Sequence, residues 1–178
     1  IFMNTFIILC GGYGKRFQAV SRDIPKILAE IKPGIIMLDW LIQEYLPLKS
    51  KIILATGHLH EKIVEYVFNK GFQEDLIFAK ETKKLGTGGA LINASKFVET
   101  EEFIALNGDT IQELSIRSFI DNSELNNDAV INIGCTTKDK NDSGKMLVDQ
   151  NNFIKSFTEK KQPNIKMHEK LKAVSSLG

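Results

Sequence analysis

The chain has 178 residues, of which 43% are hydrophobic and 25% are charged, and its formal net charge is +1. These values are typical of a soluble globular protein, and they predict a single domain over residues 1–178. With a net charge near zero, the chain has no strong positive field that would attract nucleic acid or an anionic membrane. No apolar run in the sequence is long enough to span a bilayer. The two cysteines form no C-x-x-C pair, which favours a reducing, cytoplasmic location.

The first predicted element is a buried strand over residues 4–10, which runs into a glycine-rich loop. That loop consists of Gly11, Gly12, Tyr13 and Gly14. Glycines let the backbone approach a ligand and turn its N–H groups inward, and cations such as Lys15, Arg16 and Lys26 suit phosphate. We therefore predict a phosphate-binding loop at the carboxyl end of a sheet, with a plain glycine turn as the alternative.

The spacing of this loop excludes two common phosphate-binding motifs. The P-loop requires Ser or Thr after its Lys, whereas Arg16 follows Lys15. The dinucleotide fingerprint counted from Gly12 requires a sixth-position glycine, where this chain has Phe17. The pattern that remains is G-G-x-G-x-R, followed by Pro25-Lys26.

Further along the chain, apolar periodicity predicts strands that alternate with helices, which is the pattern of a parallel α/β sheet. Helices are expected from Pro33 to about Pro47, over 57–70 with Gly71 as C-cap, over 87–98 and over 115–122. Strands are expected over 51–56, 76–80, 102–106 and 129–136.

The last part of the chain has a different pattern. Residues 145–148 and 153–157 alternate in polarity on either side of a polar turn, which indicates an antiparallel hairpin. The polar tail over 160–172 is expected to be a loop. We predict an α/β fold: a Rossmann-like, mostly parallel mixed sheet flanked by helices, with a small antiparallel hairpin insertion.

A second glycine-rich segment, L-G-T-G-G-A-L over residues 85–91, follows the strand predicted at 76–80. Its glycines allow a ligand to approach the backbone closely at the start of the predicted helix, which Gly86 and Thr87 open. The alternative is a simple helix entry in which the Thr87 hydroxyl caps the helix.

A carboxylate follows the strand predicted at 102–106, in the segment Asn107-Gly108-Asp109. Mg²⁺ commonly binds one or two carboxylates together with substrate phosphates, so Asp109 is the candidate metal ligand. The alternative is an ordinary Asn-Gly-Asp turn.

These motifs, with F-T-E-K over residues 157–160, occur in an order that resembles the sugar-1-phosphate nucleotidyltransferases, from residue 3 to about residue 160. The combination is most similar to the heptose-1-phosphate guanylyltransferases. Lys15 and Ile27 stand where the family usually has Thr or Ser and Pro. The family's later N-x-G-x-Y strand and its second metal-binding Asp have no match, so we expect a C-terminally truncated domain.

The resemblance implies roles for the motif residues. It implies that Arg16, Lys26 and Asp109 are the catalytic residues: Asp109 binds Mg²⁺, Lys26 neutralises the reacting phosphates, and Arg16 holds the β- and γ-phosphates together with Lys15. Residues implied to bind the nucleotide are Gly11, Gly12, Gly14, Lys15, Glu81, Gly86 and Thr87. Residues implied to bind the sugar phosphate are Asn107, Gly108, Glu159 and Lys160. For the last two, a surface ion pair is the alternative reading.

The base preference depends on Glu81. Many family members have a base-reading amide five residues before the first glycine of the second motif, and here that position is Glu81. A carboxylate only accepts hydrogen bonds, so it fits guanine, which offers two parallel donors. Cytosine also offers an N4 donor, and an ordinary surface acid is a further alternative.

The resemblance thus implies an enzyme that joins a nucleoside triphosphate, GTP by preference, to a sugar 1-phosphate such as D-glycero-D-manno-heptose 1-phosphate, with release of pyrophosphate. The alternatives are a cytidylyl-, uridylyl- or thymidylyltransferase and a non-catalytic nucleotide-sugar-binding module. No nucleic-acid or membrane partner is expected. A homo-oligomer is compatible with the sequence, which does not fix the oligomeric state.

Overall fold

The computed structural model describes residues 4–12, 23–111, 114–123, 131–137, 144–158 and 171–176. The chain divides into two compact units, Ile1–Asp109 and Thr110–Gly178. The single domain expected over residues 1–178 remains a prediction, and each unit is described below on its own.

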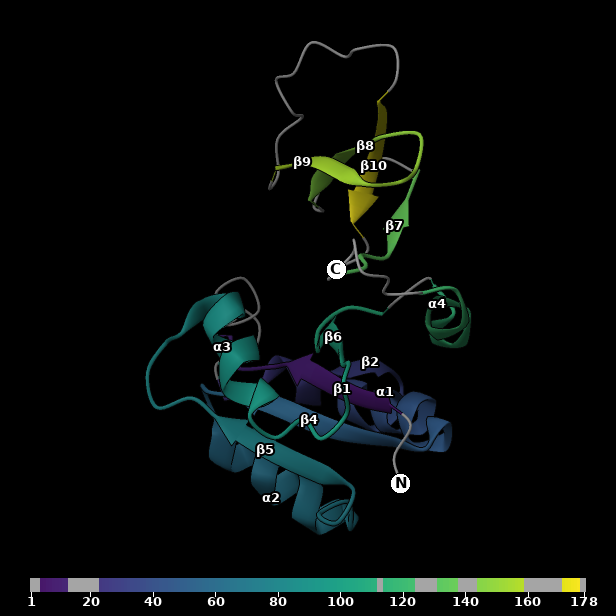
Figure 1. Cartoon of the computed structure of the whole chain (residues 1–178). Coiled ribbons are helices and arrows are strands. Elements are labelled where there is room, and N and C mark those ends of the chain that lie inside the picture. The colour runs from purple at the N-terminus through teal and green to yellow at the C-terminus, as the bar shows by residue number, and fades with distance from the viewer. Residues whose placement is uncertain are drawn as a thin grey trace. The chain divides into compact units, whose positions relative to one another are not determined.

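The first unit is built on a parallel sheet in which β1 is an inner strand (Figure 1). The strands are β1 (Asn4–Leu9), β4 (Ser50–Thr56), β5 (Leu76–Lys80) and β6 (Ile104–Asn107), in the order β5-β4-β1-β6. All three pairings are parallel, with Ile7 opposite both Ile53 and Ala105. The predicted α/β fold with a mostly parallel sheet is confirmed.

Helices cover both faces of this sheet because the apolar runs of β1 and β4 are buried on both sides. Helix α3 (Gly86–Ser95) packs on the face of Ile7 and Ile53. Tyr45 of α1 (Met37–Tyr45) stacks on Phe6, the residue before Ile7 in β1. Because neighbouring strand residues point to opposite faces, α1 packs on the face opposite α3. Figure 1 shows α2 (His60–Lys70) and α3 on opposite sides of the sheet.

The chain reverses its direction across the sheet between β5 and β6. It moves outward from β1 through β4 to β5, and it then returns to place β6 on the other side of β1. The carboxyl ends of β1 and β6 therefore flank the point where the strand order reverses. Crevices at such points are the usual ligand sites of open α/β sheets.

Some boundaries differ from the predictions. Pro33 does not start a helix, because Pro33 and Gly34 (φ 77°) turn the chain between the short strands β2 (Glu30–Lys32) and β3 (Ile35–Ile36). Gly71 is the predicted C-cap, with φ 80° and its N–H bonded to the α2 carbonyls. Two single-turn helices complete the unit, η1 (Lys26–Leu28) and η2 (Leu46–Leu48).

The second unit contains α4 (Ile116–Asn122) and an antiparallel sheet in the order β7-β10-β8-β9. Its strands are β7 (Cys135–Thr136), β8 (Lys145–Val148), β9 (Ile154–Thr158) and β10 (Lys172–Ser176). The β8–β9 hairpin was predicted and is confirmed. The strand predicted over 129–136 is confirmed only at 135–136, as β7, and is wrong for 131–134; residues 129–130 lie outside the described part.

The two cysteines have different surroundings. Cys10 directly follows β1, and its thiol donates a hydrogen bond to the Ala55 carbonyl oxygen at 3.3 Å. Burial raises the pKa of the Cys10 thiol to about 12. Cys135 in β7 is exposed.

The packing of the core of the first unit predicts how shortening a buried side chain would change the free energy of unfolding. Ile53 is fully buried in the cluster with Ile7, so Ile53→Ala should lower the free energy of unfolding by about 2–5 kcal/mol. Ile92, which is 70% exposed on α3, supplies the matched control, and Ile92→Ala should change that free energy by less than about 0.5 kcal/mol. Urea unfolding of both variants measures this difference, and equal effects would contradict the described packing.

The thiol environments predict selective alkylation. At pH 8 a thiol of pKa about 12 is ionised in only about one molecule in ten thousand, and only the thiolate reacts. Iodoacetamide should therefore modify Cys135 and leave Cys10 intact until the protein unfolds. Peptide mass spectrometry over a time course measures both rates, and similar rates at the two cysteines in the folded protein would contradict the raised pKa of Cys10.

Candidate active site

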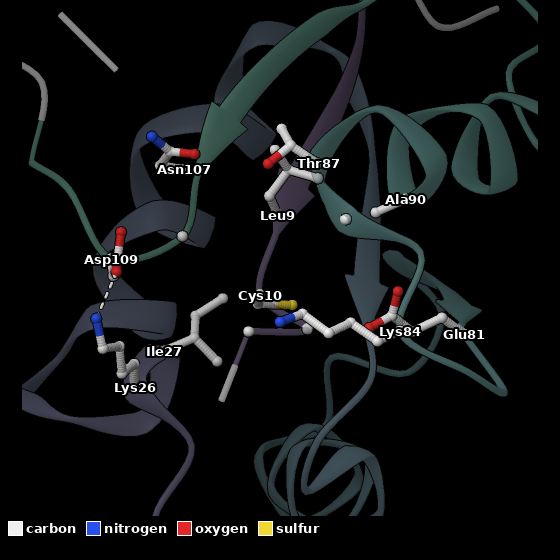
Figure 2. A pocket seen from close by; sticks show the side chains of 14 residues that line it. Leu9, Cys10, Lys26, Ile27, Glu81, Lys84, Thr87, Ala90, Asn107 and Asp109 are labelled. Atoms are coloured by element: carbon white, nitrogen blue, oxygen red, sulfur yellow. Dashed lines mark hydrogen bonds and ion pairs between the residues drawn. The ribbon is translucent and has the colours of Figure 1, made fainter. Parts of the chain in front are cut away.

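A cavity of about 290 Å³ opens at the carboxyl ends of the parallel strands, entirely within the first unit. Figure 2 shows its lining side chains. They are Leu9, Cys10, Gly11, Gly12, Lys26, Ile27, Glu81, Lys84, Gly86, Thr87, Ala90, Asn107, Gly108 and Asp109. The cavity thus lies where the strand order reverses, as expected for a ligand site of this fold.

The cavity is shaped by a close approach of backbones. A Cβ on Gly11 would lie 3.1 Å from the Gly57 nitrogen and 3.2 Å from Glu81 Oε1. A Cβ on Gly108 would lie 3.0 Å from the Leu9 carbonyl oxygen, to which the Gly108 N–H already donates a hydrogen bond at 2.9 Å. At both positions a Cβ would be tight against backbone atoms, which would have to shift by a few tenths of an ångström. Among the described residues, a Cβ on Gly12 would touch nothing within 4 Å.

One end of the cavity carries an ion pair. The Lys26 ammonium donates a hydrogen bond to Asp109 Oδ2 at 2.8 Å, although the two residues are 83 positions apart. Figure 2 shows this contact as a dashed line. Ile27, buried next to Gly108, anchors the short helix that carries Lys26. The two side chains are 35% and 44% exposed, so the pair contributes at most about 1 kcal/mol to stability and both groups remain accessible.

Another part of the cavity wall carries the Glu81 carboxylate. The Glu81 N–H donates to the Thr56 carbonyl oxygen at 2.8 Å, which fixes the backbone at the end of β5. Its Oε2 accepts a hydrogen bond from the Leu85 N–H at 3.2 Å. A Cβ on Gly57 would lie only 2.5 Å from Oε1, so the carboxylate rests directly against that glycine. Most acceptor sites of the carboxylate remain available to a ligand.

The second glycine motif begins α3 beside Glu81. Leu85 is the N-cap residue, and Gly86 has φ 72°, a conformation that residues with a side chain rarely adopt. Thr87 is therefore inside the helix, and the expectation that its hydroxyl caps the helix is wrong. Thr87 instead lines the cavity, as does Asn107 at the end of β6.

The structure thus brings nine of the predicted site residues together in one cavity: Gly11, Gly12, Lys26, Glu81, Gly86, Thr87, Asn107, Gly108 and Asp109. Five others lie outside the described residues, namely Gly14, Lys15, Arg16, Glu159 and Lys160. Their roles stay predictions. The described residues contain no group of three or more acidic, His or Cys side chains that could hold a metal. Asp109 as a metal ligand stays a prediction.

Sequence reasoning missed one charged residue of the cavity, Lys84. It also missed the apolar wall formed by Leu9 and Ala90. Only a weak signal points to Lys84 in the sequence: it directly precedes the second glycine motif and stands three residues after Glu81. Which of the adjacent lysines, Lys83 or Lys84, faces the cavity depends on the path of the loop.

No helix among the described residues is both long enough and apolar enough to cross a membrane.

Two curated relatives and one solved structure are similar to this chain. It is 34% identical over 158 residues to a D-glycero-alpha-D-manno-heptose 1-phosphate guanylyltransferase of Campylobacter jejuni, covering 86% of this chain and 67% of the relative. It is 33% identical over 117 residues to the protein of the same name from Aneurinibacillus thermoaerophilus, covering 65% and 50%. The crystal structure of HddC from Yersinia pseudotuberculosis complexed with GMP-PN has a TM-score of 0.75 and 30% identity, over 98% of this chain and 73% of that chain.

This chain therefore spans about half to two thirds of the two curated relatives. The family model described as "Nucleotidyl transferase" matches residues 5–170, which is most of the chain. That match includes the glycine loop, the Glu81 segment and the Asp109 strand end. On this evidence the chain belongs to the nucleotidyl transferase family.

Proposed function

We propose that this protein transfers a guanylyl group from GTP to a sugar 1-phosphate, D-glycero-α-D-manno-heptose 1-phosphate, and releases pyrophosphate. The observation that carries the proposal is one cavity that combines the Lys26–Asp109 pair with the Glu81 carboxylate. Family membership supports the reaction type, and the guanylyltransferase names of the two curated relatives support the base and the sugar.

The base is assigned to the Glu81 side of the cavity. The Glu81 carboxylate can only accept hydrogen bonds, and guanine presents two donors, N1–H and N2–H₂, on one edge. Leu9 and Ala90 supply apolar wall for the faces of the base. The hydrogen bond from the Leu85 N–H orients the carboxylate before the nucleotide arrives.

The reacting phosphates are assigned to the Lys26–Asp109 side. An oxygen of the sugar phosphate attacks the α-phosphorus, the bond from that phosphorus to the bridging oxygen breaks, and its electron pair leaves on pyrophosphate. A phosphate monoester with a second pKa of about 6 is already ionised at neutral pH, so no general base is needed. Lys26 neutralises the charge that develops, and the remaining catalysis is positioning.

The remaining predicted residues complete this assignment. Lys15 and Arg16, with the glycine loop, are proposed to hold the β- and γ-phosphates. Asn107, Gly108, Glu159 and Lys160 are proposed to bind the sugar phosphate. Arg16 has the planar donor geometry that suits phosphate, and Lys160 supplies a point charge.

Mg²⁺ fits the residues at Asp109. The carboxylate there already has the Lys26 ammonium against it, which marks it as a position that favours a cation. A single carboxylate is a typical protein contribution to bound Mg²⁺, and phosphate oxygens supply further ligands. When bound, Mg²⁺ supplies charge neutralisation at the phosphates. Asp109 is the residue that holds it, and Lys26 then becomes available to a phosphate.

Pyrophosphate release tests the proposed reaction. With Mg²⁺ and D-glycero-α-D-manno-heptose 1-phosphate, the protein should release pyrophosphate with GTP and far less with CTP, UTP or dTTP. Release with another triphosphate would keep the reaction type and disprove the guanine assignment. Nucleotide binding without release from any combination would favour a binding module instead.

Replacing Asp109 tests the metal assignment. Asp109→Asn should lower turnover by more than about 100-fold, because it removes the protein's charged ligand to Mg²⁺. Its melting temperature should stay within a few degrees of the parent, since the lost ion pair is exposed. Binding of Mn²⁺ to the protein–nucleotide complex, followed by electron paramagnetic resonance, should weaken in parallel. The exposed Glu101 provides the control substitution Glu101→Gln, and undiminished Mn²⁺ binding in Asp109→Asn would disprove the assignment.

A further inference from the structure

Lys84 is a charged residue of the cavity wall that the proposed mechanism does not use. It belongs to the loop between β5 and α3, directly before the Leu85 N-cap. Among the residues that the structure describes, its ammonium has no recorded hydrogen bond or ion pair. A lysine that lines a cavity without a protein partner is suited to an acceptor on a ligand.

Lys84 and Glu81 come from the same short loop and line the same cavity, yet they form no ion pair with each other within the described part. The Leu85 N–H bond to Glu81 Oε2 closes this loop and fixes the two residues relative to each other. Figure 2 shows the Lys84 side chain extending from the loop toward Cys10, with Glu81 beside the same loop. One wall therefore offers a hydrogen-bond donor and an acceptor with opposite charges.

The order of the strands separates this wall from the Lys26–Asp109 pair. Glu81 and Lys84 follow the edge strand β5, whereas Asp109 follows β6 at the opposite edge. Three strand spacings of about 4.8 Å separate the two edges by about 14 Å. Glu81 Oε1 reaches to within 3.2 Å of the position of a Cβ on Gly11, after β1, so a ligand that contacts both walls crosses less than the full width of the sheet.

We propose that Lys84 is a specificity-determining residue that donates a hydrogen bond to O6 of guanine while Glu81 accepts from N1–H and N2–H₂. The inference rests on the proposed function and deepens it. Guanine places the O6 acceptor directly beside its N1–H donor, so a donor next to a carboxylate matches that edge. Adenine carries an amino donor at position 6 and an acceptor at N1, so it mismatches both residues.

Nucleotide analogues separate the two contacts. In 6-thio-GTP a sulfur, which is a weak acceptor, replaces O6, and ITP lacks the N2 amine. The parent protein should bind 6-thio-GTP roughly tenfold more weakly than GTP, the size of one hydrogen bond to a charged group. Lys84→Met should bind GTP and 6-thio-GTP equally, and it should keep the parent's preference for GTP over ITP. Isothermal titration calorimetry measures these dissociation constants without requiring turnover.

Two further variants sharpen the test. Lys83 is exposed like Lys84 but does not line the cavity, so Lys83→Met should leave every dissociation constant unchanged. Gly57→Ala would place a Cβ 2.5 Å from Glu81 Oε1 and displace that flexible carboxylate. It should reduce the preference for GTP over ITP and keep the preference for GTP over 6-thio-GTP.

The outcomes distinguish failure of this inference from failure of the proposed function. In one outcome, the parent protein prefers GTP while Lys84→Met weakens the binding of GTP, ITP, 6-thio-GTP and UTP by one common factor. In that case Lys84 contacts phosphate, and the inference is overturned. If Lys84→Met keeps the parent's discrimination against 6-thio-GTP, the inference is also overturned. If the parent binds GTP no better than CTP or UTP, the guanine assignment and this inference fail together.

Discussion

The arrangement of the site depends on backbone packing against backbone where β1 leaves the sheet. The Gly108 N–H bonds to the Leu9 carbonyl oxygen, and the Gly11 carbonyl oxygen accepts a hydrogen bond from the His58 N–H. A Cβ at Gly11 or Gly108 would crowd these contacts. Because the strand ends meet at this distance, residues from β1, β5 and β6 can share one cavity. The glycines are thus as important to the site as the charged side chains that line it.

The sequence predicted the central sheet well because its strands are buried on both faces. The residues of β1 and β4 form continuous apolar runs, and such runs need no tertiary information to be recognised. Gly71 was also predictable, since only a left-handed C-cap explains a glycine at that point. The strand ends that carry Glu81 and Asp109 followed from the same reasoning.

Features set by tertiary contacts were not predicted. The β2–β3 pair is too short to show alternation, and Pro33 was misread because proline suits both a turn and a first helical turn. The strand β10 begins in a polar tail, and Val174 in it is buried in a cluster with its β8 partner Met146 and with Val148. The place of Lys84 on the cavity wall depends on the path of its loop, which no local pattern encodes.

The sheet order has a consequence for how this cavity can change. The loop over residues 81–87 and the end of β6 are attached to opposite edge strands, with β4 and β1 between them. Each segment is held by a backbone hydrogen bond to the neighbouring inner strand: the Glu81 N–H donates to the Thr56 carbonyl oxygen of β4, and the Gly108 N–H donates to the Leu9 carbonyl oxygen of β1. The two walls of the cavity are therefore held by separate hydrogen bonds to different inner strands. One wall can be exchanged by mutation while the opposite wall keeps its geometry.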